Sequence, residues 1–132
     1  MVKKDLFQEV VERLYQFRKK RGWLGLDPAD LAKSVVLEAA ELLECYQWDN
    51  TDRVRREVGL KKDKQKIALE AADVLIYLLD FCHENRIDLL KTALEKINLN
   101  EKRYPVPEIK KTGRQAYWEA KKRHRQKKQQ TG

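Results

Sequence analysis

The sequence contains little of what interrupts helices and little of what cross-links a fold. Its 132 residues include only five glycines, three prolines and two cysteines. Such scarcity of glycine and proline, in stretches rich in Leu, Ala, Glu and Lys, favours an all-α protein. Two cysteines are too few for a disulfide framework. Because Cys45 and Cys82 both lie in apolar helical stretches, we expect them to be small core residues in a reducing compartment.

A long uncharged apolar run is also missing. No stretch reaches the roughly 18 apolar residues that a membrane span needs, and the first residues lack the apolar core of a signal peptide. We therefore expect a soluble, cytoplasmic protein without a membrane partner. A chain of 132 residues fits a single folded domain that buries around two-thirds of its unfolded surface, to which oligomerisation can add.

The positive charge is not spread evenly. Residues 1–109 contain 20 Lys or Arg and 20 Asp or Glu, whereas residues 110–132 contain nine basic residues and one acidic residue. We therefore divide the chain into a domain at 1–109 and a basic C-terminal tail at 110–132. Tyr117 and Trp118 stand among the bases of the tail, which leaves two alternatives: a helix that docks on a neighbour, or a solvated tail that contacts polyanions such as nucleic acid.

Apolar residues at helical spacing predict four main helices, at about 3–21, 27–48, 63–84 and 87–104. Gly22 should end the first helix, and Asp27-Pro28 is typical of a helix start. A short charged helical segment is expected at about 53–58. From Ile67 to Cys82 apolar residues point in almost every direction, which predicts a helix buried inside a bundle.

Carboxylates interrupt the apolar pattern twice with the same spacing. Glu38 and Glu41 lie three residues apart in the second predicted helix, and Glu70 and Asp73 lie three apart in the third, so each pair shares a helix face. Two like charges about 4 Å apart repel by roughly 4 kcal/mol at an effective dielectric of 20, so the carboxylates should either have raised pKa values or bind a cation, and we expect a positive charge there. Hard oxygen ligands without nearby imidazole or thiolate suit Mg²⁺ or Mn²⁺.

Magnesium commonly bridges carboxylates to substrate phosphates, so cationic and aromatic partners are relevant. The candidate phosphate contacts are Lys102 and Arg103, with residues 18–21 in reserve, although a basic run at a helix end also simply complements the helix dipole. The candidate stacking surfaces for a base are aromatic: Trp23, Trp48 and Tyr77. For Trp23, which lies in a glycine-rich loop, the alternative is a structural plug at the end of the bundle. The residues by themselves thus indicate metal-dependent chemistry on a phosphate ester.

Three motifs in order carry a resemblance to a known family. They are Glu38-x-x-Glu41 with the following Leu-Leu-Glu-Cys-Tyr-Gln-Trp48, Glu70-x-x-Asp73 with Val-Leu-Ile-Tyr77, and Asn100-Glu-Lys-Arg103-Tyr104-Pro105. Over about residues 5–106 the sequence resembles the all-α nucleoside triphosphate pyrophosphohydrolase superfamily, the MazG-like group, and within it the small dCTP pyrophosphatase branch.

This resemblance implies an enzyme of nucleotide-pool housecleaning. A nucleoside triphosphate would be split between its α and β phosphates into the monophosphate and pyrophosphate, with Mg²⁺, or Mn²⁺ as a substitute, held by Glu38, Glu41, Glu70 and Asp73. Glu41 and Glu70 would be catalytic, Glu41 as general base. The substrate would be held by Asn100, Lys102, Arg103 and Tyr104, with Trp23, Trp48 and Tyr77 framing the base.

The resemblance also implies a helical bundle of four main helices per chain that is completed by oligomerisation, as a tetramer built from dimers or as a dimer. One departure concerns the base: where the resemblance predicts His-x-Pro, this chain has Leu26-Asp27-Pro28, so preference for dCTP stays open. Two other interpretations are retained. One keeps the fold with another substrate, such as dUTP or a phosphoribosyl nucleotide. The other is a non-catalytic, metal-binding interaction module with a polyanion-binding tail.

Overall fold

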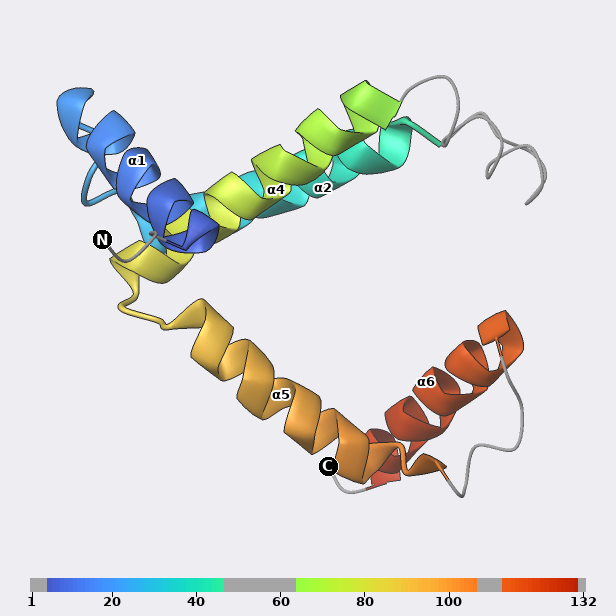
Figure 1. The fold of residues 1–132 in the computed structure, drawn as a ribbon. Helices are drawn as coiled ribbons and strands as arrows, with labels where there is room; N and C mark the ends of the chain where they lie inside the picture. Colours follow the sequence, from blue (N-terminus) through green and yellow to red (C-terminus); the bar gives the residue numbers. More distant parts are fainter. Residues whose placement is uncertain (1–4, 47–63, 107–112, 131–132) are drawn as a thin grey trace. The chain divides into compact units, whose positions relative to one another are not determined.

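The computed structural model describes residues 5–46, 64–106 and 113–130. Within these ranges the chain forms α-helices and no β-strand (Figure 1): α1 (Leu6–Lys20), α2 (Pro28–Glu44), α4 (Lys64–Glu84), α5 (Leu89–Arg103) and α6 (Gly113–Gln130). The prediction of an all-α protein is confirmed, and residues 113–130 of the predicted tail form α6. The segment predicted at 53–58 and the candidate residue Trp48 lie outside the described residues.

Helix starts follow the local signals of the sequence. The Asp27 side chain accepts a hydrogen bond from the backbone N of Ala29 at 2.7 Å, and Pro28 occupies the first turn of α2. These residues satisfy an otherwise unpaired amide and preset the helical φ angle. Asp5 caps α1 in the same way. At the other end of α1, Gly22 has a φ of +69°, which a residue with a Cβ adopts only at a cost.

Helices α2 and α4 pack side by side in opposite directions along most of their length (Figure 1). The sequence predicted that α4 is buried on all sides, and this burial is not found within one chain. Only Leu79, Asp80 and Cys82 of α4 are buried, whereas Leu69 is 56% exposed. The physical reason is that one chain covers one face of α4, and leaves its other apolar faces uncovered.

The chain separates into two compact units, Met1–Leu89 and Leu90–Gly132. The first holds α1, α2 and α4 around a small core that includes Leu31, Leu79 and Cys82. In the second, α5 and α6 meet through Ala116, which is buried, and through the rings of Tyr104 and His124, whose centroids are 6.2 Å apart. The predicted functional division at 109/110 stays a prediction.

None of the helices in the described ranges is long and apolar enough to cross a membrane. Cys45 and Cys82 are both free thiols; Cys82 is buried as predicted, and Cys45 is half-buried. Burial raises the pKa of the Cys82 thiol, which keeps it in the uncharged form.

Candidate active site

The facing sides of α2 and α4 bring together three of the four predicted metal ligands. One carboxylate oxygen from each of Glu38, Glu41 and Glu70 lies within 4.8 Å of the others. Glu38 and Glu70 are half-buried and Glu41 is exposed. The three-residue spacing in each helix places the carboxylates on the shared face, and the antiparallel packing brings the two pairs to one level.

The electrostatics of this cluster favour a cation. The pKa of Glu38 is raised by burial and by the negative charges of Glu41, Asp73 and Glu70. Asp73, the fourth predicted ligand, therefore acts on the same group although its oxygens lie outside the tight set of three. In the described part of the chain, no lysine or arginine forms an ion pair with these carboxylates. A cluster of hard oxygen donors without a neutralising partner fits a divalent cation such as Mg²⁺ or Mn²⁺.

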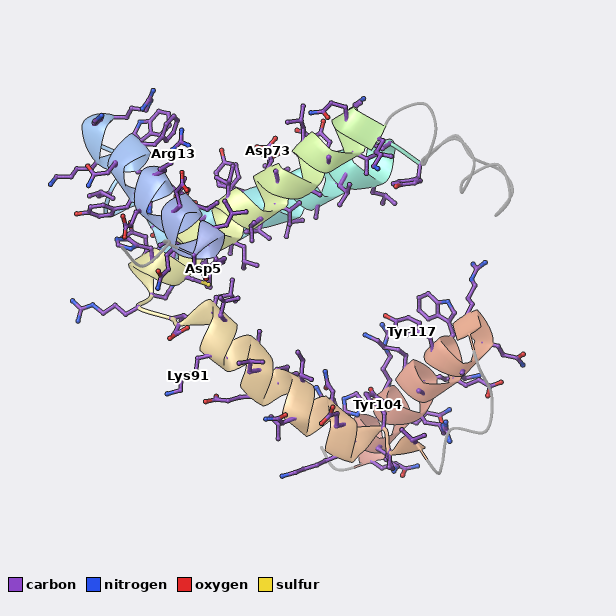
Figure 2. The ribbon with its side chains drawn as sticks, viewed as in Figure 1. Asp5, Arg13, Asp73, Lys91, Tyr104 and Tyr117 are labelled. Carbon is purple, nitrogen blue, oxygen red and sulfur yellow. The ribbon has the colours of Figure 1, made fainter. Side chains whose placement is uncertain are left out.

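Beside the carboxylates lies a pocket of about 880 Å³, bounded by α1, the loop 22–26, α2 and α4. Asp73 lines it, as do the aromatic residues Trp23 and Tyr77. Figure 2 labels Asp73 on α4 and Arg13 on α1, which line the pocket from its two sides. Pockets of this size, with apolar walls and a few polar groups, are typical of small-molecule sites. The structure thus brings two of the three predicted base-framing residues to one pocket.

A buried arginine supports the loop that carries Trp23. Arg18 is 2% exposed, and its Nη2 donates to the Trp23 carbonyl oxygen at 2.9 Å and to Glu84 Oε1 at 2.7 Å. The same Glu84 oxygen accepts from the Gly25 backbone N at 3.0 Å. Both ends of the Trp23–Gly25 turn are therefore tied to one ion pair. From the sequence, Arg18 was predicted either to contact phosphates or to complement the helix dipole, and its role in holding the loop was not predicted.

Asp80 completes the buried ion network. Arg18 Nε lies 3.4 Å from Asp80 Oδ1, an ion pair without hydrogen-bond geometry, and this oxygen has no hydrogen-bond partner among the described residues. Burial raises the pKa of Asp80, while the charge of Arg18 opposes that shift. Asp80 and Glu84 are four residues apart in the mostly apolar second half of α4, and this spacing is the sequence signal from which a buried cationic partner could have been predicted.

Trp23 itself is held by an aromatic contact with Phe17 of α1, which also lines the pocket. Its ring meets Phe17 edge-on with centroids 5.8 Å apart, and the Arg21 guanidinium lies 3.7 Å from the centre of the Phe17 ring. Such edge and cation–π contacts each add modest stabilisation. Trp23 remains about half-exposed, so one face of its ring is available beside the pocket.

The residues predicted to hold the substrate through the last motif, Asn100, Lys102, Arg103 and Tyr104, belong to the second unit. Three of them line a groove between α5 and α6, namely Asn100, Arg103 and Tyr104. Lys102 is exposed in the last turn of α5. Their position within that unit is described, and their contribution to the carboxylate site stays a prediction.

The sequence of this chain matches a known protein family. The sequence model of the MazG-like family matches residues 33–118. The dCTP pyrophosphatase 1 proteins of Bos taurus and Homo sapiens are each 31% identical over 100 residues, which is 74% of this chain and 59% of theirs. The chain therefore spans 59% of the length of these relatives.

A solved structure adds the fold to the sequence match. A pyrophosphatase from Archaeoglobus fulgidus superposes with a TM-score of 0.73 at 37% identity, covering 80% of this chain and 97% of that protein. The family match spans more than half of the sequence and includes all four candidate carboxylates. The chain belongs to the MazG-like family.

Proposed function

We propose that this protein is a nucleoside triphosphate pyrophosphohydrolase, which converts a (deoxy)nucleoside triphosphate and water into the monophosphate and pyrophosphate. One observation carries the proposal: the carboxylates of Glu38, Glu41 and Glu70 converge beside a pocket that presents Trp23 and Tyr77. A charged cluster next to an apolar, aromatic pocket suits a ligand with a polyphosphate at one end and a planar base at the other.

The proposed roles follow from position. Glu38, Glu41, Glu70 and Asp73 would hold a divalent cation, with Mg²⁺ first and Mn²⁺ as a substitute. When bound, the cation would neutralise charge on the phosphate oxygens and make the attacking water more acidic. Glu41 is the exposed member of the cluster, and we assign it the general base. Its carboxylate would take the proton of the water whose oxygen attacks the α phosphorus, while the bond to the bridging oxygen breaks and pyrophosphate leaves.

The proposed substrate class is a pyrimidine deoxynucleotide, with dCTP as the first candidate because the relatives above carry that name. Trp23 and Tyr77 would frame the base from the loop and from α4. Trp48 keeps the same proposed role from outside the described residues. Asn100, Lys102, Arg103 and Tyr104 remain the proposed contacts to the sugar and phosphates.

We further propose that the protein is a homo-oligomer, a tetramer or a dimer. Val36 and Leu43 lie seven residues apart on one face of α2 and are each 67% exposed. On α5, Leu90, Leu94 and Ile97 form another exposed apolar stripe. Apolar stripes of this kind mark association surfaces, and light scattering after gel filtration gives the number of chains directly. Replacing both Val36 and Leu43 by lysine should shift the protein to a smaller assembly, whereas a wild-type monomer would contradict this proposal.

The activity is tested by measuring pyrophosphate release from a panel of canonical and modified nucleoside triphosphates, with Mg²⁺ and with a chelator. Glu70→Ala should abolish Mg²⁺-dependent release because it removes a cluster carboxylate. Glu44→Ala is the matched control: it removes an exposed glutamate of α2 outside the cluster, and its rate should stay within about twofold of wild type.

The panel also separates the interpretations. The order of rates among dCTP, dUTP and other nucleotides identifies the preferred base. Absence of release from every nucleotide, in folded protein shown by calorimetry to bind Mg²⁺, would overturn the enzymatic proposal in favour of a non-catalytic metal-binding module.

A further inference from the structure

The second unit contains a groove of about 700 Å³ between α5 and α6 whose charge is all of one sign. No Asp or Glu lines it among the residues that the structure describes. Five lysines and arginines do: Lys96, Arg103, Lys121, Arg125 and Lys128. A concave surface with this lining concentrates positive potential and attracts phosphates.

The cations follow the helix register, so they form stripes and not a point. On α6, Lys121 and Lys128 lie seven residues apart on the face that also carries Tyr117, and Arg125 is next to them. On α5, Lys96 and Arg103 are likewise seven apart. From Tyr117 to Lys128 the α6 stripe runs for about 16 Å at 1.5 Å per residue, which suits an extended chain of phosphates better than a single phosphate group.

Exposed aromatic rings accompany the α6 stripe. Tyr117 is 55% exposed and lines the groove, and Trp118, 56% exposed, meets it edge-on with centroids 5.3 Å apart. Lys121 Nζ lies 5.4 Å from the centre of the Tyr117 ring. Figure 2 labels Tyr117 on α6 and Tyr104 at the end of α5. Large aromatic rings left in water beside a row of cations are the combination that stacks unpaired bases while the cations bind the backbone.

The pKa of His124 responds to the positive charge of the groove. Its pKa is lowered by burial and by the surrounding charges of Arg103, Lys128, Lys96 and Lys121. The imidazole therefore stays neutral at pH 7 and adds no charge of its own, while its ring packs against Tyr104. The positive charge of the groove thus belongs to the lysines and arginines.

We propose that the α5–α6 groove binds single-stranded nucleic acid, with the α6 cations on consecutive phosphates and Tyr117 stacked on a base. The exposed rings favour an unpaired strand, because bases in a duplex are already stacked. The groove includes Asn100, Arg103 and Tyr104, which we also propose as substrate contacts, so the inference concerns the α6 residues that extend beyond them.

Binding can be measured on the full-length protein by the fluorescence anisotropy of a labelled oligothymidylate of about twenty nucleotides, at several salt concentrations. Three or more phosphate contacts predict a log–log salt slope steeper than about −2. Lys121→Glu should weaken binding at least about fivefold and flatten that slope. Lys122→Glu is the matched control, since it makes the same charge change one residue along and 100° around α6, outside the groove.

Base stacking is tested in a separate experiment that compares oligothymidylate with inorganic polyphosphate, which has phosphates and no bases. Tyr117→Ala should weaken oligothymidylate binding at least about fivefold and leave polyphosphate binding unchanged. Equal effects of Lys121→Glu and Lys122→Glu would overturn the groove as the site, and equal effects of Tyr117→Ala on both probes would overturn base stacking. If Lys121→Glu instead raises KM for a nucleoside triphosphate and spares oligothymidylate binding, the groove serves the substrate and the inference is wrong.

Discussion

Arg18 on α1, which is buried, and Glu84 at the end of α4, which is half-buried, form an ion pair with 2.7 Å between Nη2 and Oε1, and this pair ties the Trp23 loop to the helices. Arg18 also donates to the Trp23 carbonyl, and Glu84 also accepts from the Gly25 amide. The two charges thus share their hydrogen bonds with the backbone of the loop. The position of Trp23, an aromatic wall of the proposed base pocket, therefore depends on an interaction between two residues that are 66 positions apart in the sequence.

Glu84→Gln should lower the free energy of unfolding by about 2–3 kcal/mol at pH 7, because it leaves the buried guanidinium with Asp80 as its remaining counter-charge. Urea unfolding followed by circular dichroism measures the change. The matched control is Glu9→Gln, which breaks the solvent-exposed pair with Arg13 at 3.7 Å and should cost less than about 1 kcal/mol. Equal losses in both variants would contradict the importance of the buried pair.

Glu84 also accounts for part of the loss of stability that we predict at low pH. Burial would raise the pKa of Glu84, but hydrogen bonds from Gly25 and Arg18 and the charges of Arg18 and His83 lower it below the usual value of 4.5. Its stabilisation is therefore fully present above pH 4.5 and is lost as the pH falls through the lower folded-state pKa.

Asp80, which also faces Arg18, has its pKa shifted upward, so its contribution to stability has the opposite sign. The effect of Glu84 is therefore measured by comparing wild type with Glu84→Gln, because both proteins keep Asp80. The melting temperature of wild type should fall more steeply below about pH 4.5 than that of Glu84→Gln. Parallel curves for the two proteins would contradict the assigned shift.

The carboxylate cluster predicts a trade between stability and metal binding. In chelator, Glu38→Gln should raise the melting temperature, because it removes repulsion from Glu41, Asp73 and Glu70 and the burial of a charge. With Mg²⁺, wild type should gain stability that grows with the logarithm of the Mg²⁺ concentration above the Kd, and the variant should gain less. Scanning calorimetry with and without Mg²⁺ measures both effects. An unchanged Mg²⁺-dependent gain in the variant would remove Glu38 from the ligand set.

Arg86 ends α4 in a left-handed conformation with a φ of 54°, which glycine adopts without a Cβ penalty. The turn is closed by hydrogen bonds from Arg86 N to His83 O and from Ile87 N to Cys82 O. Arg86→Gly should therefore raise the free energy of unfolding by about 0.5–1 kcal/mol. Asn85→Gly, at a residue with negative φ, should lower it, and the reverse order in urea unfolding would contradict this explanation.

Local signals in the sequence were sufficient for the helices and for the carboxylates. Asp27-Pro28 marked the start of α2 because its capping is made by residues two apart. The spacing of Glu38 and Glu41, and that of Glu70 and Asp73, indicated that each pair shares one face of its own helix, because helical periodicity fixes this within a helix. Fold class and the two carboxylate pairs could therefore be predicted before the structure, whereas the meeting of Glu38, Glu41 and Glu70 depends on how α2 packs against α4.

What depends on distant neighbours could not be predicted. Nothing in the run at residues 18–21 distinguishes Arg18, which is buried, from Lys19 and Lys20, which are exposed, because that depends on Glu84. The uncovered faces of α4 were missed for a related reason. A helix that is apolar all round needs partners, and the sequence does not say whether they belong to the same chain.

The proposed reaction is tested most directly by identifying the products that the protein makes from dCTP and Mg²⁺, using ³¹P nuclear magnetic resonance. We predict dCMP and pyrophosphate as the only new phosphorus species with wild type and with Glu44→Ala, and unreacted dCTP with Glu70→Ala. Formation of dCDP and orthophosphate, or identical products and rates with Glu70→Ala, would contradict hydrolysis between the α and β phosphates at the Glu38–Glu41–Glu70 cluster.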